Sequence, residues 1–204
     1  MNIVENIIEN KIVAVIRGNN KDEALNIIEG AIEGGIKLIE VTYTNKDASE
    51  IIKSLVGKYE DIVIGAGSVL NVDIARKAIK AGSKFVVGPN FDSLTSEYCR
   101  EKNVKYIPGC FTPTEIVNAL NSGVEVIKVF PGEALGPSYI KAIKAPIKDV
   151  KIMVTGGVNL ENLKEWLSSG ADSVGIGSIL SSGANGDKEK IAENARRFME
   201  KVGE

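Results

Sequence analysis

Short runs rich in β-branched residues alternate along this chain with amphipathic helical runs, at intervals of about 25 residues. This rhythm is typical of parallel sheets in which a crossover helix joins each strand to the next. The expected strands are residues 11–16, 37–43, 62–66, 84–87, 105–107, 124–130, 151–154 and 173–176. The expected helices are residues 21–33, 46–58, 72–81, 92–102, 113–121, 137–145, 160–169 and 187–202, after a short amphipathic helix within residues 1–10.

Eight strand–helix units with no linker between them predict an α/β fold, a single (β/α)8 TIM barrel that spans residues 1–204 as one domain with a short N-terminal helix. Gly82 and Gly170 fit the C-cap positions of helices, and Pro113 and Pro137 fit their first turns. The alternative is an open doubly wound sheet. It is disfavoured because the segment after the first strand, Arg-Gly-Asn-Asn, lacks the glycine fingerprint of dinucleotide-binding sheets.

Composition narrows the possible partners. The chain has 204 residues, a formal net charge of −2 and 44% hydrophobic residues, as an ordinary soluble protein does. Without a long basic run, nucleic acid and anionic membranes are poor partners. No apolar stretch has membrane-spanning length and residues 1–10 do not resemble a signal peptide, so we expect a cytoplasmic protein.

The chain contains no histidine, which excludes Ser-His and Cys-His nucleophilic systems and most zinc sites. Proton transfer must then use a carboxylate, a lysine, a tyrosine or water. No acidic cluster has the spacing of a magnesium site, so no metal is expected. Cys99 is expected to be a core thiol on a helix, and Cys110 to lie in a loop where it could line a site.

Alternation along the second expected strand places a carboxylate inside the barrel. Side chains two residues apart share a face, and Ile39, Val41 and Tyr43 form an apolar face suited to packing against helices. The inward set is then Leu38, Glu40, Thr42 and Thr44. An interior salt bridge without chemistry is the alternative interpretation of Glu40.

Lys128 lies in an expected strand, residues 124–130, that is almost wholly apolar. If Lys128 points inward, Val126 and Phe130 share its face. A buried ammonium loses hydration and shifts towards the neutral amine, which attacks ketones to form Schiff bases. An interior acid and an interior lysine can meet across a narrow barrel and divide acid, base and nucleophile roles. The alternative is a lysine at a strand end that reaches back to water.

Glycine-rich segments end three of the expected strands, at residues 65–68, 155–157 and 175–178. Backbone N–H groups of glycines after the seventh and eighth strands are the usual phosphate site of this fold. The alternative is that these glycines only turn the chain. Arg17 closes the first strand at the same end of the barrel, and its guanidinium geometry suits a substrate carboxylate.

Six motifs together resemble the class I 2-keto-3-deoxy-6-phosphogluconate and 4-hydroxy-2-oxoglutarate (KDPG/KHG) aldolases. They are Ile-Val-Ala-Val-Ile-Arg (12–17), Ile-Glu-Val-Thr (39–42), Ile-Gly-Ala-Gly-Ser-Val-Leu (64–70), Pro-Gly-Cys-Phe-Thr-Pro-Thr-Glu (108–115), Ile-Lys-Val-Phe-Pro-Gly-Glu (127–133) and Thr-Gly-Gly-Val-Asn-Leu-Glu-Asn (155–162). They run in order across nearly the whole chain.

The resemblance implies a homotrimeric barrel without a cofactor, which cleaves a 2-oxo sugar acid phosphate to pyruvate and glyceraldehyde 3-phosphate, or 4-hydroxy-2-oxoglutarate to pyruvate and glyoxylate. It also implies a place in carbohydrate metabolism by the Entner–Doudoroff route. Lys128 is implied as the Schiff-base lysine and Glu40 as the acid and base. The implied substrate-binding residues are Ser68, Pro89, Phe130, Thr155, Gly156, Gly157, Gly177 and Ser178.

Several positions differ from well-known family members. Gly88-Pro89-Asn90 varies a stretch that often reads Ser-Pro in the family. Ser68 replaces a threonine and keeps its hydroxyl, and Thr44 stands where some members carry an arginine that binds the pyruvyl carboxylate. Our hypothesis is that Arg17 supplies this charge instead. Two further functions compete with the aldolase: a phosphosugar isomerase or synthase with Lys128 as acid and Glu40 as base, and a non-catalytic trimeric scaffold.

Overall fold

The computed structural model describes residues 2–203, in which nine strands form one parallel sheet that curls into a nearly closed, barrel-like ring. The strands are β1 (Ile12–Ile16), β2 (Leu38–Thr42), β3 (Val63–Gly67), β4 (Phe85–Val87), β5 (Lys105–Ile107), β6 (Gly109–Cys110), β7 (Val126–Val129), β8 (Lys151–Thr155) and β9 (Ser173–Ile176). Their order is β5-β4-β3-β2-β1-β9-β8-β7-β6, so the two end strands are consecutive in the chain.

Pro108 separates the two end strands. It has no N–H to donate to a neighbouring strand, and the ladder breaks there. Before the break β5 pairs with β4, and after it β6 pairs with β7. The carbonyl of Pro108 accepts a hydrogen bond of 2.8 Å from the backbone N–H of Lys128. The sheet therefore contains nine hydrogen-bonded segments where the sequence predicted eight.

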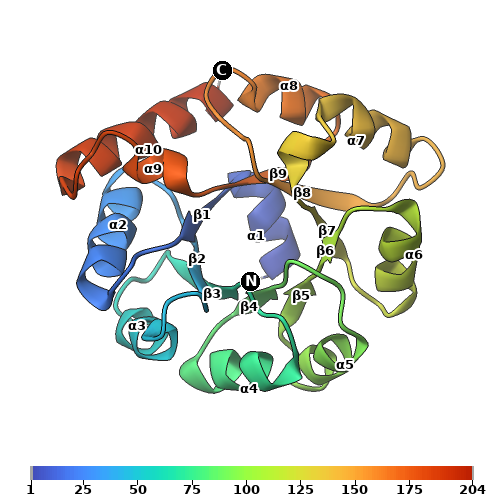
Figure 1. Cartoon of the computed structure of the whole chain (residues 1–204), viewed down its shortest axis with the longest axis horizontal. Helices are drawn as coiled ribbons and strands as arrows, with labels where there is room; N and C mark the ends of the chain where they lie inside the picture. The colour runs from blue at the N-terminus through green and yellow to red at the C-terminus, as the bar shows by residue number, and fades with distance from the viewer. Residues whose placement is uncertain (1, 204) are drawn as a thin grey trace.

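Helices surround the strands as an outer ring (Figure 1). They are α2 (Lys21–Glu33), α3 (Ala48–Leu55), α4 (Val72–Ala81), α5 (Ser93–Glu101), α6 (Pro113–Asn121), α7 (Pro137–Lys144), α8 (Leu163–Ser168), α9 (Ser178–Ser181) and α10 (Lys188–Gly203), with a 3-10 turn η1 (Gly132–Ala134) after β7. A further helix, α1 (Ile3–Asn10), does not belong to this ring (Figure 1). The sequence did not predict η1 and α9, because single turns are too short to show a helical period.

Local capping explains where several helices begin and end. Asn71 accepts a hydrogen bond from the backbone of Ile74 at the start of α4, and Thr112 and Glu115 form a capping box before α6. Pro113 occupies the first turn of α6, as predicted. Gly82 ends α4 with φ = 105°, a left-handed conformation that favours glycine.

The protein has two hydrophobic cores, one on each face of the sheet. The outer core lies between strands and helices and includes Ile39, Val41, Ile127 and Val129. The inner core includes Val13, Leu38, Phe85, Val126 and Met153, and Val4 and Ile7 of α1 pack against it. In Figure 1 α1 lies across the centre of the ring of strands. The alternation predicted for the strands around Glu40 and Lys128 is therefore confirmed.

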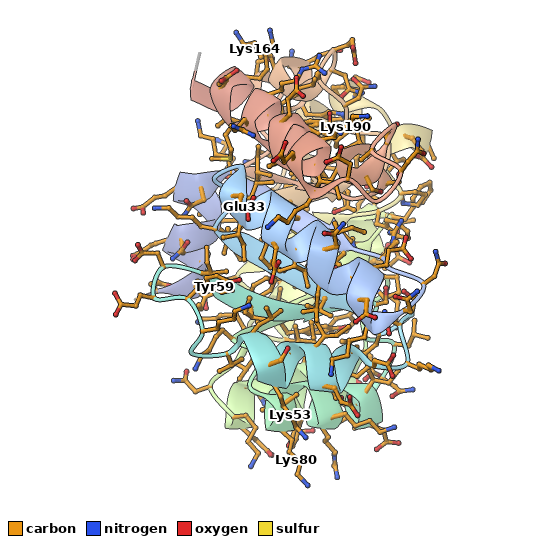
Figure 2. The ribbon with its side chains drawn as sticks, turned by 90° about the vertical axis from the view of Figure 1, so that its left-hand side faces the viewer. Glu33, Lys53, Tyr59, Lys80, Lys164 and Lys190 are labelled. Atoms are coloured by element: carbon orange, nitrogen blue, oxygen red, sulfur yellow. The ribbon has the colours of Figure 1, made fainter. Side chains whose placement is uncertain are left out.

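Charged side chains of the outer helices point away from the sheet. Figure 2 shows Lys53 and Lys80 extending from α3 and α4 into solvent, and Glu33 on the surface of α2. Glu33 forms an ion pair of 2.6 Å with Lys188 there. Within residues 2–203 no helix combines the length and the apolar character needed to cross a membrane. Against this pattern, a lysine and a glutamate on the inner face of the sheet are exceptional.

Candidate active site

Strands β2 and β7 bring Glu40 and Lys128 together inside the barrel. Both side chains are buried, with 0% of Glu40 and 4% of Lys128 exposed. Lys128 Nζ lies 3.9 Å from Glu40 Oε1. In the sheet, β1, β9 and β8 separate the two strands, so the side chains meet across the interior and not along one edge. This is the arrangement that strand alternation predicted.

The backbone of Lys128 is fixed on both sides. Its N–H donates to the carbonyl of Pro108, and the residue pairs in register with Met153 of β8. Its ammonium nitrogen lies 5.0 Å from the ring centroid of Phe130, within the range in which an aromatic face attracts a cation. The ring of Phe130 therefore adjoins the side-chain nitrogen of Lys128, where it would favour a positive charge.

Glu40 is held without the hydrogen bonds that a buried carboxylate normally has. Among residues 2–203 neither of its side-chain oxygens has a hydrogen-bond partner, and 3.9 Å to Lys128 is beyond hydrogen-bond range. Burial raises the pKa of Glu40 above its ordinary value of 4.5, while the charges of Lys128 and, less strongly, Arg17 act in the opposite direction. A carboxyl group in this state can release and recover a proton nearer to neutral pH than an exposed one.

A cavity of about 340 Å³ opens at the carboxyl ends of β1, β7, β8 and β9. The predicted site residues that line it are Arg17, Phe130, Thr155, Gly156, Gly157, Gly177 and Ser178. Glu133 of η1 also lines it, which the sequence did not predict, although it ends the Pro-Gly-Glu segment after β7. A smaller cavity of about 150 Å³ lies near α1 and the first residues of β5 and β7, at the other end of the barrel from this site.

The glycines of this cavity expose the backbone. Gly156 and Gly157 have φ values of 99° and 74°, which L side chains rarely adopt. Next to them, the hydroxyl of Thr155 is buried and has no hydrogen-bond partner among residues 2–203. An unpartnered hydroxyl at the wall of a polar cavity is ready to bind a ligand oxygen.

Five predicted residues do not line this cavity. Two are Glu40 and Lys128, which are buried inside the barrel. The other three, Thr44, Ser68 and Pro89, lie at the same end of the barrel as the cavity. Thr44 is exposed after β2, and its hydroxyl lies 2.7 Å from that of Thr42. Ser68 follows β3 with φ = 56°, a conformation uncommon for residues other than glycine. Pro89 follows β4 and is half-buried. These positions belong to the opposite side of the barrel mouth, at the ends of β2, β3 and β4.

The two cysteines take no part in the site. Cys99 is a buried thiol on α5, as predicted. The prediction for Cys110 was wrong, because this residue lies in β6 and packs in the outer core. Burial raises the pKa of each thiol to about 12, so neither forms a nucleophilic thiolate near neutral pH. Among residues 2–203 no cluster of acidic or cysteine side chains is placed to hold a metal ion.

Known proteins resemble this chain over nearly its whole length. The family model described as KDPG and KHG aldolase matches residues 3–194. The chain is 34% identical over 190 residues to the 2-dehydro-3-deoxy-6-phosphogalactonate aldolase of Escherichia coli (strain K12), with 92% of each protein covered. It is 35% identical over 159 residues to the 2-dehydro-3-deoxy-phosphogluconate aldolase of Treponema pallidum (strain Nichols), with 78% of this chain and 76% of that protein covered.

A solved structure extends the likeness to the fold. It is a KDPG aldolase from Legionella pneumophila with pyruvate captured at low pH as a covalent carbinolamine intermediate. It superposes on this chain with a TM-score of 0.88 at 27% identity, and the match covers 96% of this chain and 97% of that one. The chain therefore belongs to the KDPG and KHG aldolase family and is a class I aldolase, a carbon–carbon lyase.

Proposed function

We propose that residues 1–204 form one (β/α)8 barrel domain, in which residues 105–110 are a single strand interrupted at Pro108. We also propose that Lys128 is the nucleophile that forms the Schiff base. One observation carries this assignment: a buried lysine amine adjoins a fully buried carboxylate that has no other partner among residues 2–203. Such a pair contains the nucleophile and the proton carrier that cleavage of a 2-oxo acid requires.

The reaction begins when the neutral amine of Lys128 attacks the C2 carbonyl of the substrate. The Glu40 carboxyl protonates the hydroxyl of the resulting carbinolamine, which loses water and leaves an iminium ion; the final hydrolysis returns this proton to Glu40. The Glu40 carboxylate then takes the proton of the C4 hydroxyl, the C3–C4 bond breaks, and its electron pair moves into the iminium to give an enamine. C4 leaves as an aldehyde. The Glu40 carboxyl returns its proton to C3, and water hydrolyses the new iminium to pyruvate and the free amine of Lys128.

The substrate class follows from the names of the relatives and from the groups that line the cavity. The names of the relatives include phosphogluconate-derived and phosphogalactonate-derived acids as well as 4-hydroxy-2-oxoglutarate, written KHG. A terminal phosphate would bind the backbone and hydroxyl groups of Thr155, Gly156, Gly157, Gly177 and Ser178, which share one cavity. With that phosphate the products are pyruvate and glyceraldehyde 3-phosphate, as in the Entner–Doudoroff route; with 4-hydroxy-2-oxoglutarate they are pyruvate and glyoxylate.

Reductive trapping tests the covalent step. Incubation with pyruvate and borohydride should add a reduced pyruvyl mass to Lys128, located by peptide mass spectrometry. Lys128→Arg keeps the positive charge but forms no imine, so the adduct and the release of pyruvate should both disappear. An enzyme that turns over a phosphosugar but gains no pyruvyl label would favour the isomerase or synthase mechanism. A protein with neither the label nor any turnover would be a scaffold.

The raised pKa of Glu40 predicts the pH dependence. Only the carboxylate form accepts the C4 proton, so kcat/KM should fall as the pH drops through a pKa above the ordinary 4.5, since burial disfavours the charged form. Glu40→Gln should remove this acid limb and lower kcat by roughly 10²–10⁴-fold. Initial rates of pyruvate release between pH 4.5 and pH 9 measure both effects. If Glu40→Gln kept the same acid limb as the natural enzyme, that limb would belong to another titrating group.

Arg17 is proposed to bind the pyruvyl carboxylate in place of the arginine that Thr44 replaces. Its side chain lines the cavity, whereas Thr44 does not. Arg17→Ala should weaken pyruvate binding by roughly 10–100-fold, which corresponds to the loss of one charged hydrogen-bonded contact. The concentration of pyruvate that half-saturates borohydride inactivation measures this. Arg76→Ala, a change on α4 outside the cavity, controls for the lost charge; equal affinities in the two variants would refute the role of Arg17.

We further propose a homotrimer in the cytoplasm. Large apolar side chains are exposed on consecutive parts of the barrel: Leu70, Leu94, Phe111 and Val117. Further copies of the chain would bury such a surface. Cell fractionation followed by sedimentation velocity tests both statements. We expect a soluble species with three times the mass of the 21.8 kDa chain, and Leu94→Glu with Val117→Glu should shift it to the monomer. A membrane pellet, or a monomer before mutation, would contradict the proposal.

A further inference from the structure

Strand β3 turns two glycines towards the interior of the barrel, Gly65 and Gly67, and each leaves space for a side chain of a neighbouring strand. A Cβ atom at Gly65 would lie 2.4 Å from the ring of Phe85. A Cβ atom at Gly67 would lie 2.1 Å from Oε1 of Glu40, 2.6 Å from its Cγ and 2.7 Å from its Cδ. Real Cβ contacts are not this short, so the Glu40 side chain occupies the place where a side chain of residue 67 would begin.

The pairing register shows how the carboxylate reaches this place. The Cα of Glu40 pairs with that of Gly65, and the Cα of Thr42 pairs with that of Gly67. The side chain of Glu40 therefore leans two residues along β3, towards the carboxyl end of the barrel. In this position its Oε1 atom is 3.9 Å from Lys128 Nζ.

The backbone gives no other reason for glycine at this position. Gly67 is absent from the residues with positive φ, so its conformation is one that any L residue adopts. The three atoms nearest to the added Cβ all belong to Glu40. Space for that one side chain is the constraint.

We propose that Gly67 is a positioning residue for the aldolase reaction: its missing side chain seats the Glu40 carboxylate against β3 and keeps it from closing on Lys128. This inference rests on the proton-transfer role of Glu40 proposed above. A methyl group at position 67 would push the carboxylate away from β3 and towards the barrel axis. There it would meet the side-chain nitrogen of Lys128, now 3.9 Å from Oε1, and form a closer ion pair that holds the carboxylate away from its place against β3.

A stability cycle tests the seat without any assay of activity. Gly67→Ala is made in the natural sequence and in a Glu40→Ala background, and thermal unfolding is followed for each protein. The methyl group should lower Tm by about 3–10 °C in the natural sequence, the usual effect of overpacking, and by much less once the Glu40 side chain is gone. If Gly67→Ala fails to fold alone but folds with Glu40→Ala, the seat is supported. An equal penalty in both backgrounds, or two unfolded proteins, would overturn it.

The pH profile tests positioning as distinct from packing. In folded Gly67→Ala, kcat/KM should fall at least tenfold, and its acid limb should move to lower pH by about one unit, because a nearer ammonium favours the carboxylate. The side chain of aspartate is one methylene shorter than that of glutamate. Gly67→Ala should therefore lower kcat/KM by a smaller factor in a Glu40→Asp background than in the natural sequence. Retention of both the rate and the acid limb would reduce Gly67 to a packing residue and overturn the proposal.

Gly65→Ala is the matched control, since it adds the same atom to the same face of β3. The three atoms nearest to its methyl all belong to Phe85, so its loss of Tm should persist in the Glu40→Ala background and its acid limb should stay in place. If Glu40→Ala also reduced the loss of Tm caused by Gly65→Ala, the contact with Glu40 would not be specific to position 67, and the proposal would be overturned. Because the stability cycle needs no turnover, a failed aldolase assay would contradict the proposed function and leave the seat standing.

Discussion

The incomplete pairing of two buried charges is the feature on which the site depends. Glu40 and Lys128 are both removed from water, yet their nearest polar atoms stay 3.9 Å apart. A fully hydrogen-bonded buried ion pair compensates each group for its lost hydration. A pair held just beyond hydrogen-bond range keeps the desolvation of both groups without that compensation, and for Glu40 the desolvation raises the pKa and favours the neutral carboxyl. Buried polar groups without partners are rare, and they concentrate where chemistry needs them.

The rest of the barrel maintains this state. Below the two charges the interior is filled by apolar side chains such as Leu38, Val126 and Met153, and α1 packs against this inner core. This apolar core and α1 occupy the amino-terminal end of the barrel, where the smaller cavity lies. The larger cavity opens at the carboxyl end, where Phe130 and Thr155 line it. Access from the carboxyl end suits a Schiff-base enzyme, because substrate must enter while bulk water is limited.

Strand alternation was sufficient to predict the interior position of Glu40, since a period of two depends only on the pleat. For Lys128 it predicted only which residues share its face if it points inward, because both faces of that strand are apolar. Features that depend on contacts between strands escaped prediction. The expected strand at residues 105–107 is β5, and beyond Pro108 the chain adds β6, which was not predicted and which places Cys110 in the sheet and not in a loop. The contact between Gly67 and Glu40 depends on the register of β2 and β3 and on the lean of a side chain, which a single sequence does not show. The family resemblance named Thr44, Ser68 and Pro89, but the cavity lies beside other strands.

This asymmetry of the barrel mouth orients the substrate under the proposed mechanism. The cavity borders β1, β7, β8 and β9, and its glycines Gly156, Gly157 and Gly177 follow β8 and β9. A substrate joined through C2 to Lys128 would extend its phosphate towards those glycines. Glu40 approaches from β2, on the other side of Arg17 and β1. Glu40 and the phosphate site then lie on different sides of the carbon chain of the substrate. The C4 hydroxyl must therefore point towards β2 before Glu40 can take its proton. Gluconate-derived and galactonate-derived acids differ in configuration at C4. Under this mechanism, the configuration that the enzyme accepts depends on β2, which carries Glu40, and on the contacts that hold the Glu40 carboxylate in place.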